Sequence, residues 1–452
     1  MPETRSKGRP DGRSKGRSKV WLWLKRIALT VVALFVLLLA MIGLLTSTRG
    51  TPVEYVLAKD DPRGPPSVDH TLFLRTIELN TGVDIEHGNA VQVLLNGDGT
   101  YQQLWRDLRS CQHTVTVQMY FSQPGVVADT LARVLGECAR RGVRVLLLLD
   151  GFGSSSLSKQ WREKLAAAGV EVALLRQLRW YTLHMATERS HARVVVVDGR
   201  VAYTGGFGLA DYWLGGGQKP DEWRETNVRF EGPAVSQLQA AFAVAWAEAT
   251  GELLTGEAFY PPIAFDTVGT VRAGLFHAVP STGSTPAERF YALTIAGARR
   301  SLYITNAYFV PDDDFRRLLT AAAKRGVDVR VLTTGPNTDV HSTLWAGQWR
   351  YPELLKAGVR IYEYQPANMH AKTLSVDGVW GAVGSMNFDN RSLAFNNETT
   401  LLMLDRRMVA GMDTMFIDDL RSSKQITLQE VERWPWWHRV RSALANTMER
   451  VL

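Results

Sequence analysis

The chain has 452 residues, 45% of them hydrophobic and 21% charged, which is long enough for two large cores or one fused pair. Its formal net charge is +7, but residues 1–26 hold nine Lys or Arg against two acids, so the excess lies entirely there. The other residues carry equal numbers of acids and bases. That balance weighs against a nuclease, because affinity for a polyanion depends on clustered cations.

Residues 27–45, which follow the basic segment, contain no charge and are rich in Leu, Val and Ala. They predict a transmembrane helix, with Trp21 and Trp23 at the membrane interface. The positive-inside rule places residues 1–26 in the cytoplasm as a basic tail and the body on the extracytoplasmic side of a cell membrane. A cleaved signal peptide is the alternative, but the apolar run is long and no small-x-small cleavage site precedes Arg49.

Residues 46–87 have a mixed, proline-containing composition that predicts a linker. We expect one lobe over 88–250, a second linker over 251–284 and a second lobe over 285–420. Residues 421–452 contain a C-terminal amphipathic segment in which apolar residues recur at helical spacing beside arginines. This segment suits a bilayer surface or packing on its own domain, and both remain open. The stripe comprises Trp437, Val440, Leu444, Met448 and Val451.

The two predicted lobes share short matching segments in the same order, which indicates a duplicated α/β domain. Each half is predicted to run strand, helix, strand, helix, motif strand, strand. A pseudo-two-fold pairing of the halves would bring equivalent strands to one shared cleft, whereas separate domains would share no site. The matches are Met119–Phe121 with Ala307–Phe309, Arg141–Val145 with Arg325–Val329, Ala168–Val170 with Ala357–Val359, and Glu225–Val228 with Glu398–Leu401.

One pattern, a His followed by a cation two residues later and an Asp seven residues later, occurs in both halves. The residues are His191, Arg193 and Asp198 in the first copy and His370, Lys372 and Asp377 in the second. The apolar run inside each copy predicts a buried strand, and residues two apart on a strand face the same way. We therefore expect each histidine and its cation to point into the cleft. Each aspartate lies at odd spacing beside a turn, where it would support the strand end.

Two imidazoles with two cations are what phosphoryl transfer without a metal ion requires. One ring attacks phosphorus, the other protonates the departing alcohol, and the cations neutralise charge on the phosphoryl oxygens. The sequence contains no Cys/His cluster and no P-loop pattern, so neither zinc nor a nucleotide is expected and no cofactor is predicted. The two cysteines, Cys111 and Cys138, are too few for a disulfide framework, and their pairing stays open.

From residue 88 to 419 the chain resembles the phospholipase D superfamily, and most closely its bacterial cardiolipin synthase-like branch. Besides the two motifs, the resemblance rests on further segments of differing composition in the expected order. These are Asn96–Asp98, Leu178–Tyr181, Asn306–Pro311, Glu363–Pro366 and Gly384–Ser392. It implies two fused α/β lobes, a shared active site and phospholipid substrates at a membrane.

The resemblance also implies roles for individual residues. His191 would be the nucleophile that forms a phosphohistidine, and His370 the general acid and then base, although the near-symmetry leaves their order open. Glu225 and Glu398 would orient the histidines. Ser385 and Asn387 match positions that bind phosphate, whereas Gly206 and Gly208 occupy the same places in the first half and offer only backbone N–H groups. Arg193 replaces the family's lysine.

The expected activity is therefore transfer of a phosphatidyl group from one phosphatidylglycerol to another, which yields cardiolipin and glycerol. Hydrolysis to phosphatidic acid would use the same residues. A phosphodiester nuclease and a non-catalytic membrane scaffold remain further alternatives, the latter because of Arg193 and the two glycines. The sequence does not predict the oligomeric state.

Overall fold

The computed structural model describes residues 14–47, 53, 56, 65–177, 188–262, 268–281 and 283–447. The chain divides into two compact units, Met1–Arg49 and Gly50–Leu452. The motif at 178–181 and two positions of the predicted C-terminal stripe, Met448 and Val451, lie outside the described residues.

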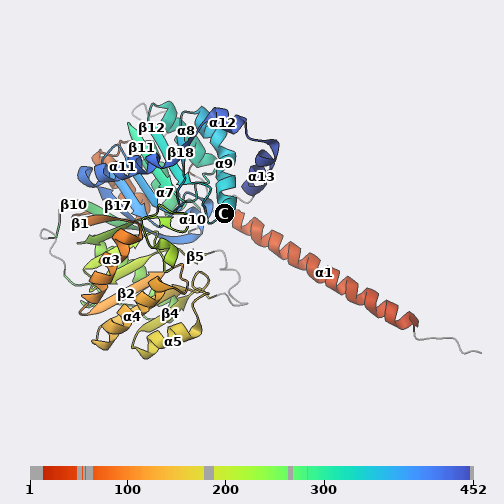
Figure 1. Ribbon diagram of the computed structural model, residues 1–452, viewed down its shortest axis with the longest axis horizontal. Helices are drawn as coiled ribbons and strands as arrows, with labels where there is room; N and C mark the ends of the chain where they lie inside the picture. Colours follow the sequence, from red (N-terminus) through yellow and green to blue (C-terminus); the bar gives the residue numbers. More distant parts are fainter. Residues whose placement is uncertain are drawn as a thin grey trace, which may run out of the picture. The chain divides into compact units, whose positions relative to one another are not determined.

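The first unit contains one helix, α1 (Ser14–Ser47), drawn in red in Figure 1. Its segment Trp21–Met41 is long and apolar enough to cross a membrane, and every side chain in it is exposed. A helix that is apolar on all sides and has no protein core around it matches a membrane span. The helix starts at Ser14, so the second part of the predicted basic tail is continuous with the apolar span.

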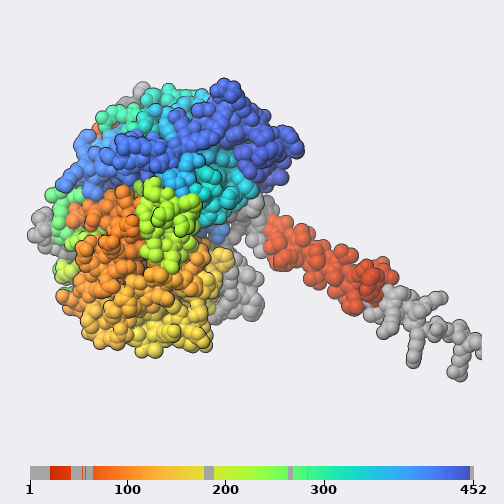
Figure 2. Space-filling view, in the orientation of Figure 1, coloured from red at the N-terminus to blue at the C-terminus, as the bar shows by residue number. Residues whose placement is uncertain are grey.

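The second unit is a mixed α/β structure of two lobes, of which the first runs from orange to green and the second from green to blue in Figure 2. Lobe 1 comprises β1 (Glu86–Leu95), α3 (Asn96–Arg109), β2 (Thr114–Met119), α4 (Val126–Arg140), β3 (Arg144–Asp150), α5 (Lys159–Ala167), β4 (Glu171–Leu175), β5 (Arg189–Ser190), β6 (Val194–Val197), β7 (Val201–Gly205), the 3₁₀ helix η2 (Asp211–Trp213), β8 (Trp223–Arg224), β9 (Thr226–Glu231) and α6 (Ala234–Thr250).

Lobe 2 repeats this order and then extends it at the C-terminal end. It comprises β10 (Val271–Ala278), α7 (Pro286–Gly297), β11 (Ser301–Asn306), α8 (Asp313–Lys324), β12 (Asp328–Thr334), α9 (His341–Lys356), β13 (Arg360–Tyr364), β14 (Asn368–Met369), β15 (Lys372–Val376), β16 (Trp380–Gly384), α10 (Asn390–Ala394), β17 (Asn396–Leu404), α11 (Arg406–Arg421), β18 (Ser423–Ile426), α12 (Leu428–Glu432) and α13 (Trp436–Asn446).

A single large sheet runs through both lobes (Figure 1). From the outer edge inward, lobe 1 has the order β4-β3-β2-β6-β7-β9-β1 and lobe 2 the order β13-β12-β11-β15-β16-β17-β10, with β18 outside β13. The orders correspond strand by strand, and β1 pairs antiparallel with β10 at the centre. This is the predicted pseudo-two-fold arrangement of two α/β lobes.

The motif strands β6 and β15 lie inside the sheet, and each pairs antiparallel with both of its neighbours. Their side chains alternate between two buried layers, as expected for a strand covered on both faces. In β6, Val195 and Val197 pack in the core beneath α4, whereas Val194 and Val196 pack in the core that includes α6. The second core also takes in Val383 and Leu401 of lobe 2, so the lobes share apolar packing as well as strand pairing.

The predicted linker over 46–87 was wrong over part of its length. Residues Thr71–Thr81 form α2, which buries Phe73, Leu74 and Ile77 in the lobe 2 core. His70 caps its first turn, because its ring accepts a hydrogen bond from the Leu72 amide at 3.1 Å. The mixed, proline-containing composition masked a short amphipathic helix.

The second predicted linker, 251–284, and the C-terminal segment, 421–452, also contain sheet strands. β10 is the innermost strand of lobe 2, and β18 pairs with β13 at the outer edge. Lobe 2 therefore begins before residue 285 and ends after residue 420. Both cysteines are free and buried in lobe 1.

Candidate active site

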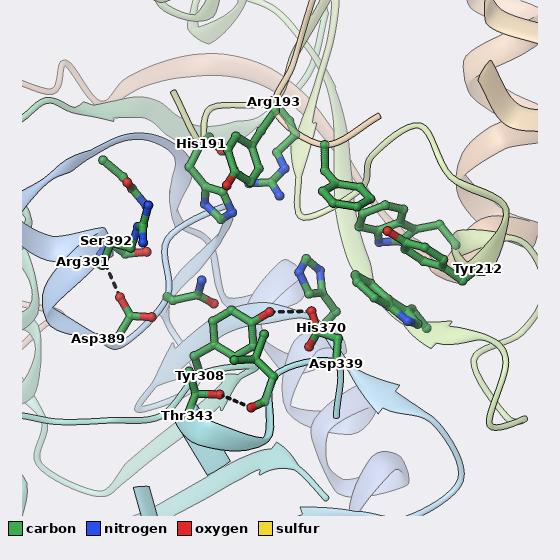
Figure 3. A pocket seen from close by; sticks show the side chains of 17 residues that line it. His191, Arg193, Tyr212, Tyr308, Asp339, Thr343, His370, Asp389, Arg391 and Ser392 are labelled. Carbon is green, nitrogen blue, oxygen red and sulfur yellow. Dashed lines mark hydrogen bonds between the residues drawn. The ribbon is translucent and has the colours of Figure 1, made fainter. Parts of the chain in front are cut away.

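The two motif histidines line one pocket of about 470 Å³ (Figure 3). His191 and His370 are 7% and 4% exposed, so both rings are buried in the wall of this pocket. Each lies just before its motif strand. The shared cleft expected from the duplicated motifs is thus present, and Arg193, Tyr120, Tyr308 and Asn387 also line it. Lys372 is not in the lining, so the expectation that both motif cations point into the cleft was wrong for Lys372.

Short strand pairings between the lobes hold each histidine in place. β5, directly before His191, pairs with the start of β17, and β14, directly before His370, pairs with β8. The partner strands carry or precede the two predicted glutamates, so each histidine meets the glutamate of the opposite lobe. His191 Nδ1 lies 2.9 Å from Glu398, and His370 Nδ1 lies 2.6 Å from Glu225.

These contacts determine which ring nitrogen is available for chemistry. A carboxylate at Nδ1 accepts the N–H there, fixes the tautomer and leaves Nε2 for a substrate. Both glutamates are fully buried at 0% exposure, and neither lines the pocket. Their contacts therefore make them positioning residues.

The two histidine–glutamate pairs differ in electrostatics. Burial, Arg193 and Lys372 hold the pKa of His191 well below its ordinary value. Burial and Lys372 also lower the pKa of His370, but Glu225 opposes that shift. Burial would raise the pKa of Glu225, yet His370 and Lys372 bring it below the ordinary value. His370 therefore keeps a proton more readily than His191.

Glu398 stabilises a proton on His191 less than Glu225 stabilises one on His370. Burial raises the pKa of Glu398 to about 7, against the opposing effects of Ser385 and Arg193. A carboxyl group that is only partly ionised near neutrality stabilises an imidazolium poorly. His191 is therefore suited to remain neutral, which leaves its Nε2 lone pair free to act as a nucleophile.

The motif cations bind the main chain of their own histidines. Arg193 Nη1 donates to the His191 carbonyl at 2.5 Å and Nε donates to the Phe207 carbonyl at 3.3 Å. Lys372 Nζ donates to the His370 carbonyl, and burial lowers its pKa to about 7. The arginine thus reaches a second carbonyl that the lysine does not bind, which gives the departure from the family's lysine a local structural basis.

Both motif aspartates lie outside the pocket lining. Asp198 accepts hydrogen bonds from the amides of residues 112, 113 and 114, and Asp377 from those of 299, 300 and 301. Both have positive φ angles, 53° and 54°. Each ties the end of its motif strand to the start of the neighbouring strand, β2 or β11, and so supports the site from a distance.

Ser385 contacts a positioning glutamate instead of the pocket. Its hydroxyl donates to Glu398 at 2.5 Å and accepts from the Thr399 amide at 2.9 Å. In the equivalent place, a Cβ on Gly206 would come within 2.5 Å of the Glu225 carboxylate oxygens. There the Trp213 indole donates to Glu225 at 3.1 Å, so an indole replaces the missing hydroxyl.

The second glycine of that turn makes room for the same tryptophan. A Cβ on Gly208 would lie 2.7 Å from the Trp213 ring, whereas the equivalent Asn387 lines the pocket directly. Of the four predicted phosphate-binding positions, the structure places only Asn387 in the pocket lining. The glycines accommodate Trp213, whose ring also contacts His370 edge to face at a centroid distance of 5.5 Å.

The sequence matches the family profile described as "Cardiolipin synthase, PLD-like domain" over residues 104–246 and 291–420. The chain belongs to this family. Cardiolipin synthase of Geobacillus kaustophilus is 32% identical over 362 residues, which cover 80% of this chain and 72% of that protein. Cardiolipin synthase A of Pseudomonas putida is 33% identical over 347 residues, covering 76% and 70% of the two chains.

Solved structures with the same fold are more distant in sequence from this member of the cardiolipin synthase family. Phosphatidylserine synthase of Haemophilus influenzae Rd KW20 superposes with a TM-score of 0.65 at 10% identity, covering 84% of this chain and all of that one. Polyphosphate kinase of Porphyromonas gingivalis gives 0.51 at 11% identity, over 80% and 53% of the two chains. At these identities the similarity concerns the fold alone.

Several pocket residues were not among the predicted site residues. The aromatic ones come mainly from lobe 1, and the polar ones come from lobe 2. Aligning the two halves through the histidines places Tyr212 opposite Arg391 and Trp213 opposite Ser392, but none of these four was a predicted site residue, so the alignment gave no signal for them. The set is Phe121, Tyr212, Trp213, Trp223, Tyr308, Asp339, Val340, Thr343, Asp389, Arg391, Ser392 and Asn396, in addition to Tyr120.

Tyr308 and Asp339 form a hydrogen-bonded pair beside His370. The Tyr308 hydroxyl donates to Asp339 at 2.6 Å, as Figure 3 shows, and its ring centroid is 6.4 Å from that of His370. Asn368 donates to the other oxygen of Asp339 at 3.1 Å. Within the described ranges, no group of three or more His, Cys, Asp or Glu is placed to hold a metal ion.

Proposed function

We propose that the protein is a membrane-anchored phosphatidyltransferase that converts two phosphatidylglycerol molecules into cardiolipin and glycerol. The observation that carries this proposal is the pair of imidazoles in one pocket, each bound at Nδ1 by a glutamate of the opposite lobe. The substrate assignment is supported by relatives named cardiolipin synthase. The apolar helix α1 would hold the enzyme at the membrane where both lipids reside.

In the first step, His191 Nε2 attacks the phosphorus of the donor. A P–N bond forms, the P–O bond to the glycerol headgroup breaks, and His370 gives its Nε2 proton to the departing oxygen. In the second step, His370 takes the proton of a hydroxyl on the acceptor's glycerol. That oxygen bonds to phosphorus and the P–N bond breaks, so both histidines return to their initial states.

This assignment of roles follows from the electrostatic difference between the pairs. His191 has the lower pKa and beside it lies the less ionised glutamate, which suits a neutral nucleophile. Glu225 supports a proton on His370, which suits a general acid. The cations lower the pKa of both rings in the empty pocket, and the negative charge of a bound phosphodiester would oppose that effect.

A trapping experiment tests both the reaction and the roles. Purified protein in mixed micelles is given phosphatidylglycerol labelled in its phosphate, and the lipid products are separated into cardiolipin and phosphatidic acid. We expect cardiolipin from the wild type and none from His191→Ala or His370→Ala. We further expect an acid quench of the wild type during turnover to trap base-stable, acid-labile label on the protein, and none to be trapped on His191→Ala.

Other outcomes would redirect the proposal. Phosphatidic acid as the sole product would identify a hydrolase, because water would have taken the acceptor's place. Label trapped on His191→Ala but not on His370→Ala would reverse the two roles. DNA cleavage that depends on His370, without lipid turnover, would identify a nuclease, and a protein without turnover whose histidines are dispensable in cells would be a scaffold.

The proposal also places the catalytic unit on the extracytoplasmic side of the cell membrane, with residues 1–26 in the cytoplasm. This orientation is supported by the basic residues that precede the apolar span, through the positive-inside rule. A cysteine introduced at Leu253, which is 72% exposed, should react with a membrane-impermeant maleimide in intact cells. Labelling only after the cells are opened would reverse the orientation.

A further inference from the structure

The pocket has two chemically different sides, although the lobes that form it are duplicates. Relative to each motif histidine, positions 206, 208, 212 and 213 of lobe 1 correspond to 385, 387, 391 and 392 of lobe 2. Lobe 1 has Gly, Gly, Tyr and Trp there, whereas lobe 2 has Ser, Asn, Arg and Ser. Figure 3 shows Arg391, Asp389 and Ser392 on one side of the histidines and Tyr212 on the other. Divergence has made one side aromatic and the other polar and cationic.

Arg391 differs from the other cations near the histidines. Arg193 and Lys372 bind the carbonyls of the motif histidines, so both cations are committed to the main chain beside those histidines. Arg391 lies in the first turn of α10 and lines the pocket. Among the residues that the structure describes, none forms a hydrogen bond or ion pair with its guanidinium. It therefore offers an uncommitted cation to a ligand beside the central phosphate.

The neighbouring carboxyl, Asp389, is not paired with this guanidinium. Asp389 caps α10 by accepting from the Ser392 amide at 2.8 Å. Its complete burial raises its pKa to about 6, although Arg391 opposes the rise. The carboxyl oxygen is engaged with the main chain, and no contact within ion-pair distance joins it to Arg391. Asp389 is therefore largely ionised near neutrality, but its oxygen is committed to the main chain and leaves the Arg391 guanidinium free to bind an anion.

We propose that Arg391 binds the phosphodiester of the acceptor lipid, one glycerol unit away from the phosphorus that is transferred. The inference rests on the proposed function, in which the acceptor carries its own phosphate, and it explains why the site would need a third cation. A planar guanidinium can bind two phosphate oxygens at once. A hydrolase, whose acceptor is water, would have no use for this contact.

The test compares two acceptors in the same enzyme. Arg391→Gln and wild type are assayed in mixed micelles for cardiolipin formation, and separately for exchange of labelled free glycerol into phosphatidylglycerol. The donor and the first step are identical, and only the acceptor's charge differs. We expect cardiolipin formation to fall roughly tenfold or more, because a charge-assisted contact is lost, while glycerol exchange stays near the wild-type rate. Arg391→Lys should restore part of the cardiolipin activity.

Equal losses with both acceptors would overturn the inference, since Arg391 would then act on the donor or on the chemistry. Unchanged cardiolipin formation would overturn it too. A wild type that transfers to water or glycerol but never to phosphatidylglycerol would instead refute the proposed function, and this inference with it. The glycerol exchange reaction therefore distinguishes failure of the inference about Arg391 from failure of the proposed function.

A second surface carries an independent inference. α13 presents a row of apolar side chains to solvent, with Trp436 75%, Val440 48% and Leu444 64% exposed at spacings of four residues. Trp437, 52% exposed, lies beside this row. The dark blue C-terminal segment forms part of the outer surface of the second unit in Figure 2. The opposite side of α13 packs on α9, where Ala445 is buried with Val310 and Ala346.

The charges on α13 are all positive. It contains Arg439 and Arg441 and no acid, and Arg441 lies over the rings of Trp345 and Trp437 at 4.4 and 5.5 Å from their centroids. A helix with tryptophans, aliphatic residues and arginines has the composition of one that binds an anionic membrane surface.

α13 also runs antiparallel to α9 and ends near the part of α9 that lines the pocket. Trp434, just before α13, contacts Tyr351, whereas Ala445 lies against Ala346. Thr343, in the first turn of α9, lines the active-site pocket. We infer that the exposed face of α13 binds the anionic bilayer surface and brings the lipids close to the mouth of the pocket.

A fluorescent label tests this in the full-length chain. An environment-sensitive dye is attached to a cysteine introduced by Trp436→Cys, with Leu253→Cys, 72% exposed and outside α13, as the control. Both native cysteines are buried, so the introduced one should react first. In phosphatidylglycerol nanodiscs we expect spin-labelled lipids to quench the dye at 436 and not at 253. No quenching at 436, or equal quenching at both positions, would overturn the inference.

Discussion

At the scale of single residues, the two halves of the site depend on each other. His191 belongs to lobe 1 and is oriented by Glu398 of lobe 2, while His370 of lobe 2 is oriented by Glu225 of lobe 1. The two carboxylates have different partners, Ser385 for one and Trp213 for the other. Two equivalent positions therefore provide unequal electrostatics, and in the proposed mechanism that inequality allows one imidazole to attack while the other carries a proton.

Replacing Glu225 should change the pH dependence of the reaction. The carboxylate raises the pKa of His370, so in Glu225→Gln the proton on His370 is lost at lower pH. We expect the alkaline limb of kcat/KM to move to lower pH and kcat to fall roughly 10- to 100-fold, as for other groups that orient a reactive side chain. The pH profile in mixed micelles measures both effects.

Glu398→Gln is the matched control, because it replaces the equivalent carboxyl of the other pair. It should lower kcat and leave the alkaline limb, which reports on His370, close to that of the wild type. An unchanged limb in Glu225→Gln would contradict the assignment of His370 as the general acid.

A methyl group at Gly206 should be more harmful than the loss of the hydroxyl at Ser385. The new Cβ would lie 2.5 Å from both Glu225 oxygens, so the carboxylate or Trp213 must move. Gly206→Ala is therefore expected to lower the thermal midpoint and to abolish most of the activity. Ser385→Ala removes one hydrogen-bonding group without a clash, so it should be less harmful. Thermal unfolding and cardiolipin assays of the two variants test this order.

At the scale of secondary-structure elements, the motif aspartates join strand ends. Asp377→Ala removes the acceptor of three main-chain amides and places alanine at a φ of 54°. We expect a loss of about 2–4 kcal/mol in the free energy of unfolding, measured by chemical denaturation. Asp377→Asn keeps one acceptor oxygen and tolerates positive φ, so it should lose less. Equal losses in the two variants would show that the amide contacts contribute little.

The motif strands and the duplicated order of elements could be predicted because short-range patterns encode them. The valine run after Arg193 predicts a buried strand, which the structure has as β6. The repeated spacing indicated that the second motif strand, β15, lies across the same cleft. The crossing of Glu225 and Glu398 was not predictable. It depends on the pairing of β5 with β17 and of β8 with β14, each two residues long and far apart in sequence.

Other elements were missed for different physical reasons. α2 lies in a segment whose prolines predicted a linker, and β10 lacks strict alternation because Gly274 and Leu275 are both buried in the sheet. Trp213 gave no signal as a site residue, since its hydrogen bond to Glu225 depends on the space left by Gly206 and Gly208. Such a contact appears only once the turn is folded.

At the scale of the whole molecule, the apolar helix and the catalytic body are separate compact units. A chain that starts at Gly50 retains the described cores of the second unit, so its thermal midpoint should match that of the full chain. Its turnover of phosphatidylglycerol in detergent micelles should also be retained. On vesicles we expect turnover to fall roughly tenfold or more, because the anchor no longer concentrates the enzyme at its substrate. Loss of activity in micelles as well would show that residues 1–49 contribute to the fold.

The antiparallel pairing of β1 with β10 makes the junction between the lobes a row of backbone hydrogen bonds inside one sheet. Opening that junction would break the ladder and expose the core shared by α6 and β17, which makes a hinge between the lobes a costly route of entry. Two bulky lipids must then enter and leave through the rim of a fixed hollow. We therefore expect exchange of substrates to depend on the loops and on α9 and α10, which contribute to the pocket lining, and a bridge that locks the lobes together should leave the turnover rate intact.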